Sequence, residues 1–303
     1  MNAENKLPVP GIGNRISFHL DGRSVLLDRR INAVRGDLAD ISLAGVLFAP
    51  HYAKAEPMQC SANAAFLRES GAHDAPAVSQ LLSGEIFHLL DVTGDWAWGF
   101  CDNDAYVGYV ERSALDAHPA PTTHRVVALN APLFTQADIK SPVIAQLPAG
   151  ALVGGEVEGD FIATAKGYLH TRHALSIANA ELDWVTEAEK QIGQPYVWGG
   201  RGAGGIDCSG LVQLALGQAG VRVPRDSDMQ RESIGEDIAA NEQLQRGDLL
   251  FFPGHVGIMI DAENMLHANA YWMSTVVEPL ADVVTRLKVD HEEPVLARRR
   301  ILL

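Results

Sequence analysis

The stretch GRGAGGIDCSGLVQLALGQAG, residues 200–220, places Cys208 between a glycine-rich run and an apolar segment. Asp207 is a preferred N-cap residue, so the pattern predicts a helix that begins at Cys208. The buried stripe of this helix would consist of Leu211, Val212, Leu214 and Ala215. In the first turn of a helix the macrodipole favours a thiolate, and the N–H of the cysteine can face a developing oxyanion. The stretch therefore indicates a nucleophilic cysteine, although a buried structural thiol is the commoner explanation of such a residue alone.

The composition predicts a folded protein of two or three domains. The chain has 303 residues, of which 47% are apolar and 20% are charged. A net charge of −14 without a basic stripe argues against nucleic acid and against an anionic membrane surface as partners. The cysteines Cys60, Cys101 and Cys208 are too few and too far apart for a disulfide framework. The first twenty residues do not resemble a signal peptide, and no apolar run approaches the roughly 18 residues of a membrane helix. We therefore expect a cytoplasmic protein, and the sequence leaves its oligomeric state open.

The chain divides into four segments by periodicity. Residues 1–45 mix Pro and Gly with charged runs, and we expect an extended arm and a short helix there. Residues 46–117 alternate apolar and polar positions in short strands separated by glycines, which is typical of a small closed β-barrel. After the linker AHPAPTT, residues 117–123, a weakly similar block at 124–178 predicts a second barrel. From residue 181 to 303, helical periodicity is followed by strand candidates, which is the order of an α+β domain.

Two histidines in the last segment complete a candidate catalytic set. In RGDLLFFPGHVGIMIDAENMLHANA, His255 and His267 flank a predicted hairpin whose turn lies near Asp261 to Asn264. A four-residue turn would place His267 opposite Ile258. A cysteine, a base and a group that orients the base are what acyl transfer requires. Each histidine alone is more often a hydrogen-bonded core or surface imidazole, so the spacing by itself leaves the triad open.

Other motifs give no cofactor or metal site. GGRGAGG lacks the Lys-Ser/Thr of a phosphate-binding loop, and HTRH, with His170 and His173, lacks further ligands at metal spacing. We therefore expect neither a cofactor nor a metal.

The motifs from Tyr196 to Ala268 resemble those of NlpC-type cysteine peptidases, a papain-like family that cleaves bacterial cell-wall peptides. The family pattern of Tyr, Trp-Gly-Gly, Asp-Cys-Ser-Gly, Gly-Asp-Leu, Gly-His-Val-Gly-Ile and His-Ala occurs here in order. The resemblance covers residues 181–303 and implies Cys208 as nucleophile, His255 as base and His267 as the group that orients the base. It also implies an antiparallel sheet packed against the Cys208 helix. We expect Tyr196 to add an oxyanion donor.

The upstream blocks resemble bacterial SH3-like barrels. Members with such barrels are similar to γ-D-glutamyl-L-diamino-acid endopeptidases, which cut murein stem peptides and prefer a free L-Ala amino terminus. The resemblance implies that the first barrel closes one end of the cleft. The matching substrate-binding positions are Glu69, Tyr106, Asp207, Ser209 and Ser227. The carboxylates of Asp207 and Glu69 suit the substrate ammonium, and Arg201, Arg225 or Arg172 would meet its D-Glu carboxylate.

The predicted fold is thus two all-β SH3-like barrels followed by an α+β papain-like catalytic domain. The predicted activity is hydrolysis of the γ-D-Glu–diamino acid bond in murein tri- or tetrapeptides, as part of cell-wall peptide recycling. Two alternatives stay open at this point. One is an amidase or acyltransferase on the same scaffold, and the other is an inactive wall-peptide binding protein.

Overall fold

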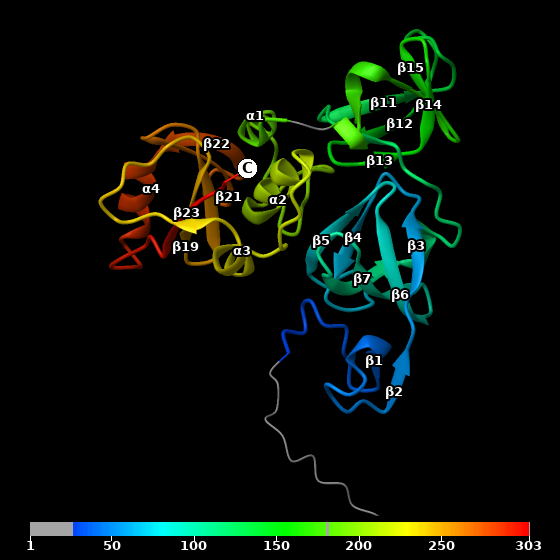
Figure 1. Cartoon of the computed structure of the whole chain (residues 1–303), viewed down its shortest axis with the longest axis horizontal. Helices are drawn as coiled ribbons and strands as arrows, with labels where there is room; N and C mark the ends of the chain where they lie inside the picture. The colour runs from blue at the N-terminus through cyan, green and yellow to red at the C-terminus, as the bar shows by residue number, and fades with distance from the viewer. Residues whose placement is uncertain (1–26, 180–181, 303) are drawn as a thin grey trace, which may run out of the picture.

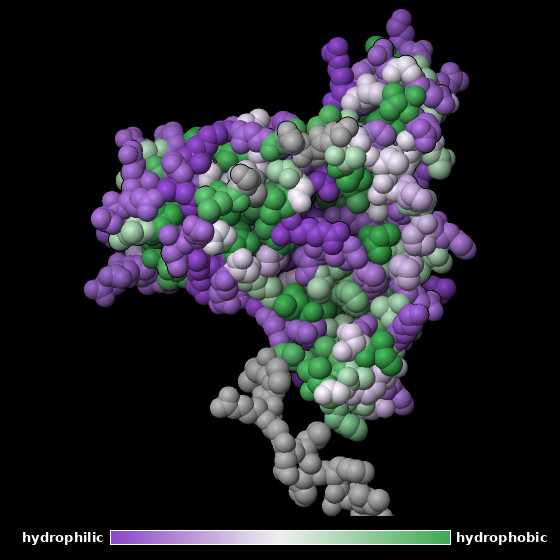
Figure 2. Space-filling view, in the orientation of Figure 1, coloured by the Kyte–Doolittle hydropathy of each residue, from purple (hydrophilic) through white to green (hydrophobic). Residues whose placement is uncertain are grey.

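The structure, a computed structural model, describes residues 27–179 and 182–302. Within these residues, a mixed unit with helices and a sheet lies beside two β-rich units (Figure 1). The chain passes through the two β-rich units before it enters the mixed unit. Hydrophilic residues gather where the units meet, at the centre of the view in Figure 2.

The mixed unit is built on a six-stranded antiparallel sheet with strand order β18-β23-β19-β20-β21-β22. Its strands are β18 (Glu236–Asp237), β19 (Asp248–Phe252), β20 (His255–Met259), β21 (Asn264–Asn269), β22 (Ser274–Pro279) and β23 (Ala297–Arg300). Side chains of a strand alternate between faces, and Leu249 and Phe251 of β19 join the core on one face while Leu250 and Phe252 join the core on the other. Both faces of the sheet are therefore covered, which explains why β19 is apolar throughout.

Four helices accompany this sheet within the described residues: α1 (Trp184–Glu189), α2 (Cys208–Gln218), α3 (Ser227–Ser233) and α4 (Leu280–Leu287). Helix α2 begins at Cys208 as predicted, and the Asp207 side chain accepts a hydrogen bond from the Gly210 N–H at 2.7 Å. Residues of α2 share a hydrophobic core with β19, β20 and β21, whereas Val283 of α4 packs on the opposite face.

Helix α2 is buried around most of its circumference, which the predicted single stripe did not anticipate. The reason is that its second side meets the β-rich units. Gln213 Nε2 donates to Asp104 Oδ2 at 2.8 Å, and Gln218 Nε2 donates to the Val126 carbonyl at 2.9 Å. The helix that carries Cys208 thus lies between its own sheet and both upstream units.

The first β-rich unit holds a seven-stranded sheet with order β5-β4-β8-β7-β6-β3-β9. Its elements are β3 (Glu56–Cys60), β4 (Ala64–Arg68), β5 (Ala77–Leu82), β6 (Ile86–Thr93), β7 (Trp96–Cys101), β8 (Val107–Glu111), the 3-10 helix η2 (Arg112–Ala114) and β9 (Leu115–Asp116). Cys60 and Cys101 are buried in its core, around Leu67, Leu81 and Phe87. These two cysteines therefore serve packing.

The second β-rich unit has a three-stranded sheet, β13-β10-β17, and a five-stranded sheet, β12-β11-β16-β15-β14. Its elements are β10 (His124–Val126), β11 (Asn130–Phe134), β12 (Val143–Pro148), β13 (Leu152–Val153), β14 (Gly155–Glu158), β15 (Phe161–Thr164), β16 (Gly167–His170), η3 (Thr171–His173), β17 (Ala174–Ser176) and η4 (Ile177–Asn179). It touches the first unit closely, since the Leu152 N–H donates to the Ser83 carbonyl at 2.7 Å. Gly84 (φ +80°) is required at this contact because a Cβ there would lie 2.1 Å from the Leu152 oxygen.

The segment before the first β-rich unit is only partly described. The predicted arm covers residues 1–45, and residues 1–26 lie outside the described residues. The described part of the arm contains strand β1 (Leu38–Asp40) and the 3-10 helix η1 (Ile41–Leu43). Strand β1 pairs in parallel with β2 (His51–Ala53), which lies beyond residue 45. Among the described residues, no helix is long and apolar enough to cross a membrane.

The predicted pairing of His267 with Ile258 is wrong. Ile258 pairs with Leu266, and the Ile260 N–H donates to the Asn264 carbonyl at 3.0 Å. The turn is one residue shorter than predicted because Asp261 Oδ1 accepts the N–H groups of Glu263 and Asn264 and closes it tightly.

Candidate active site

A cavity of about 290 Å³ lies at the start of α2. The sequence-predicted residues that line it are Glu69, Tyr106, Tyr196, Asp207, Cys208, Ser209 and Ser227. Glu69 and Tyr106 come from the first β-rich unit, and the others come from the mixed unit. The structure therefore brings residues more than 130 positions apart to one cavity, whose wall also includes Gly254, the residue before His255.

Cys208 is the first residue of α2 and is buried. Burial raises the pKa of its thiol to about 12, and the negative charge of Asp207 adds to this effect. Hydrogen bonds from the Val256 and Ser209 backbones and the charge of Arg225 act in the opposite direction. The helix start therefore does not by itself produce a thiolate, and the sulfur carries its proton at neutral pH.

His255 and His267 lie on the neighbouring strands β20 and β21, and the two rings are joined by a hydrogen bond of 2.8 Å between His255 Nε2 and His267 Nδ1. Burial, followed by the charge of His267, lowers the pKa of His255 to about 3, so the ring is neutral at rest. Among the hydrogen bonds of the described residues, none joins the Cys208 sulfur to an imidazole. The sulfur instead meets the backbone of Val256, the residue after His255. Such contacts often tighten only when substrate binds.

Glu278 is a member of this group that sequence reasoning missed. Its Oε1 lies 2.7 Å from His267 Nε2, and Arg286 of α4 pairs with the same carboxylate at 2.5 and 3.1 Å. Glu278 on β22 pairs in register with Met265 on β21, which places it on the sheet face of His267. The strand β22 was not predicted, so nothing in the sequence singled out this carboxylate.

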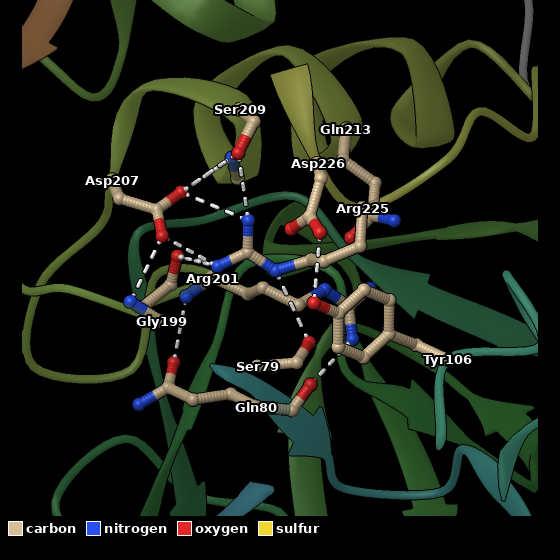
Figure 3. A network of polar contacts seen from close by, with 12 residues as sticks. Ser79, Gln80, Tyr106, Gly199, Arg201, Asp207, Ser209, Gln213, Arg225 and Asp226 are labelled. Atoms are coloured by element: carbon tan, nitrogen blue, oxygen red, sulfur yellow. Dashed lines mark hydrogen bonds and ion pairs between the residues drawn. The ribbon is translucent and has the colours of Figure 1, made fainter. Parts of the chain in front are cut away.

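The predicted direct pairing of Asp207 with a substrate ammonium is not supported, because its carboxylate is already saturated (Figure 3). It accepts hydrogen bonds from the Gly199 and Gly210 N–H groups at 2.9 and 2.7 Å, and from Arg225 at 3.0 and 2.6 Å. Ser209 also donates to it at 3.3 Å and accepts from Arg225 at 2.9 Å. A carboxylate offers about four lone-pair sites. Asp207 and Ser209 therefore hold Arg225 and the glycine-rich loop in place.

Asp226, which sequence reasoning also missed, is the carboxylate that stays partly open at this cavity. Its side chain is 25% exposed, and its Oδ2 accepts from the Tyr106 hydroxyl and from Arg30 Nη1, each at 2.8 Å. No hydrogen bond among the described residues uses its Oδ1. Glu69 lies exposed on the same cavity. Asp226 precedes Ser227 directly, so the run that drew attention to Ser227 was the available signal.

The three arginines predicted to meet the D-Glu carboxylate are not free in the cavity. Arg225 is paired with Asp207. Arg201 is buried and pairs with Glu85 of the first β-rich unit at 2.7 and 2.9 Å. Arg172 is exposed on η3 and lies outside this cavity. The arginine that does line the cavity beside Arg225 is Arg30, from the segment that precedes β1.

Comparisons with known proteins match two parts of this chain. Residues 193–283 match the model of the NlpC/P60 family, and residues 67–115 match that of the bacterial dipeptidyl-peptidase SH3 domain. A probable endopeptidase of Mycobacterium tuberculosis is 41% identical over 99 residues, which are 32% of this chain and 25% of that protein. A γ-D-glutamyl-L-lysine dipeptidyl-peptidase of Bacillus cereus is 34% identical over 107 residues, which are 32% of this chain and 31% of that protein.

The match thus spans between a quarter and a third of the length of these curated relatives. A crystal structure of an NlpC/P60 family protein from Bacillus cereus shares the fold with a TM-score of 0.69 at 20% identity. This likeness covers 82% of the present chain and 100% of that one. The chain therefore carries an NlpC/P60 domain at residues 193–283, preceded by a bacterial dipeptidyl-peptidase SH3 domain at residues 67–115.

Proposed function

We propose that the chain is a cysteine endopeptidase that hydrolyses the γ-D-Glu–diamino acid bond of murein stem peptides with a free N-terminal L-Ala. The observation that carries this proposal is that Cys208 shares one cavity with Glu69 and Tyr106 of the SH3 domain. The similarity to a γ-D-glutamyl-L-lysine dipeptidyl-peptidase of Bacillus cereus supports cleavage of the same bond. A role in cell-wall peptide recycling is part of the proposal.

The free amino group would be recognised by Glu69 and by the open Oδ1 of Asp226. Tyr106 keeps its proton, because burial and the neighbouring Asp226 charge raise the pKa of its phenol, and it donates to Asp226 Oδ2. Two carboxylates that meet an ammonium lose that partner when the amino group is acylated. An unpaired, desolvated charge costs several kcal/mol, so an acylated peptide would be rejected.

The chemistry would begin with a neutral thiol and a neutral imidazole. His255 takes the Cys208 proton while the sulfur attacks the γ-carbonyl carbon, and the tetrahedral oxyanion forms beside the Cys208 N–H. This N–H has no acceptor within α2 because it belongs to the first residue of the helix. Tyr196 would donate a second hydrogen bond, since burial and the nearby Cys208 and Asp207 side chains raise the pKa of its phenol and keep it protonated.

Collapse of this intermediate releases the diamino acid, whose nitrogen receives the proton from His255. A thioester between Cys208 and the γ-carboxyl group of D-Glu remains. Water then attacks the thioester carbonyl carbon while His255 takes one of its protons. The carbon–sulfur bond breaks, His255 returns that proton to the Cys208 sulfur, and D-Glu is released with its γ-carboxylate ionised.

The proposed function includes a division of the chain into four segments. We assign residues 46–117 and 124–178 as two SH3-like barrels and residues 181–303 as a papain-like catalytic domain, after an N-terminal segment at 1–45. The separate hydrophobic cores of the two β-rich units support a duplicated arrangement. The shared core of α2 and the six-stranded sheet supports the catalytic assignment.

The test compares L-Ala-γ-D-Glu-L-Lys with its N-acetylated form, with wild-type protein and Cys208→Ala. We expect release of L-Lys from the free peptide alone, and a loss of turnover of about 10⁶-fold in Cys208→Ala. Equal cleavage of the acetylated peptide would favour the amidase or acyltransferase alternative. Binding of the tripeptide without any turnover by the wild type would favour a wall-peptide binding protein.

A further inference from the structure

Four side chains form a connected row that runs across strands β20, β21 and β22 to helix α4. His255 on β20 contacts His267 on β21 at 2.8 Å, His267 contacts Glu278 on β22 at 2.7 Å, and Glu278 contacts Arg286 on α4 at 2.5 Å. His267 is 1% exposed, so water does not compete for its ring nitrogens. The side chains of the row therefore decide among themselves which histidine ring nitrogens carry a hydrogen.

Glu278 determines which nitrogens carry hydrogen because its carboxylate is ionised and cannot donate a proton. Burial alone would raise its pKa, but hydrogen bonds from Arg286, Trp272 and His267 outweigh burial and hold the pKa below its ordinary value. An ionised carboxylate only accepts, so His267 Nε2 must carry its hydrogen. A neutral imidazole then has an acceptor at Nδ1, and His255 must donate to it from Nε2. What remains on His255 is a lone pair on Nδ1.

We propose that Glu278 is a positioning residue that sets the tautomers of both histidines and thereby leaves Nδ1 of His255 as the proton acceptor for Cys208. This inference rests on the proposed function, since it assumes that His255 is the base. The charged group that faces Glu278 is Arg286 from α4, and the titratable rings beside it are His267 from β21 and, one ring further along, His255, with the Trp272 indole also in contact. Burial lowers the pKa of His267, so its ring is neutral. Arg286 is itself held over the Tyr271 ring at 4.3 Å, and Asp282 lies near it.

Asn269 competes with Glu278 for the same nitrogen. Its Nδ2 lies 3.0 Å from His267 Nε2, and its Oδ1 is occupied by the Trp272 N–H at 2.9 Å, so the amide presents a donor. If Asn269 decided which nitrogens carry hydrogen, His267 would donate from Nδ1, and His255 Nδ1 would carry a hydrogen and accept nothing from the thiol. The contact with Glu278 is shorter and charged, and such hydrogen bonds are roughly twice as strong as neutral ones.

The direct test is long-range ¹H–¹⁵N NMR of the histidine rings in the full-length wild-type protein near pH 7. We expect both His255 and His267 to be neutral and protonated on Nε2. Rings protonated on Nδ1 would overturn the inference. This measurement needs neither substrate nor turnover, so it stands even if the proposed peptide is not cleaved.

Kinetics of three variants on the tripeptide supply the second readout. Glu278→Met removes the acceptor with little change in volume, and we expect kcat to fall roughly 10²- to 10⁴-fold with little change in KM, as for other misplaced tautomers. Glu278→Gln should recover part of this loss, because its amide oxygen can still accept from His267. Asn269→Ala removes the competing donor, and kcat should fall far less in this variant than in Glu278→Met. A large loss in Asn269→Ala with a normal kcat in Glu278→Met would contradict the role of Glu278.

Discussion

The ion pair of Arg201 and Glu85 joins the NlpC/P60 domain to the SH3 domain, and Arg201→Met tests how much this junction contributes. The side chains of Arg201 and Glu85 are 6% and 11% exposed, and Arg201 also donates to the Gln80 carbonyl at 2.7 Å. Within the described residues, the variant would leave the Glu85 carboxylate with the Leu82 N–H as its remaining hydrogen bond. It would also remove the positive charge beside the buried carboxyl group of Asp104. Burial raises the pKa of Asp104, and the charge of Arg201 lowers it again in part.

Removing one partner of a buried pair typically destabilises a protein by about 3–5 kcal/mol, because the remaining charge stays buried without compensation. We expect a loss of that size in the free energy of unfolding, measured by urea titration with tryptophan fluorescence. KM for the free tripeptide should rise as well, because Glu69 and Tyr106 belong to the domain that this pair holds in place.

Two controls sharpen this experiment. The double variant Arg201→Met/Glu85→Met removes both charges and should recover most of the loss, since apolar replacements of a buried pair are often neutral. Arg172→Met makes the same substitution at an exposed position and should change stability by no more than about 0.5 kcal/mol. A cost of less than about 1 kcal/mol in Arg201→Met, or a double variant no more stable than the single one, would refute a stabilising role of this ion pair.

Three further predictions concern the cavity. His255 acts as a base in its neutral form, which predominates above its pKa, and that pKa is lowered to about 3. The acid limb of the pH profile of kcat/KM should therefore lie well below the ordinary histidine pKa of 6.5. An acid limb at about pH 6–7 in initial-rate measurements would contradict this. Tyr196→Phe removes an oxyanion donor and should lower kcat by about 10²-fold, or roughly 3 kcal/mol, whereas an unchanged kcat would exclude that role. Tyr106→Phe removes the hydrogen bond to the Asp226 carboxylate, a contact of about 1.5–3 kcal/mol, and should raise KM for the free tripeptide at least tenfold; an unchanged KM would separate Asp226 from amine recognition.

The local order of the catalytic segment could be predicted from the sequence. Asp207 is an N-cap residue ahead of an apolar run, so helix α2 begins where the pattern indicates. Alternating apolar residues around His255 and His267 indicated two neighbouring strands, and the structure has them as β20 and β21. These features depend on residues within a few positions of one another, where capping and side-chain periodicity are decided.

The tertiary structure alone decided which carboxylates remain open to a ligand and which ring nitrogens of the histidines carry a hydrogen. Asp207 appeared to be open to a substrate, yet Arg225, 18 positions away, occupies it. Asp226 receives Arg30 from 196 positions away and Tyr106 from 120 positions away. Glu278 reaches His267 only because β22 pairs with β21 in one particular register. Ionic and proton-transfer properties depend on desolvation and on partners a few ångströms away in space, and neither is encoded in the spacing of residues along the chain.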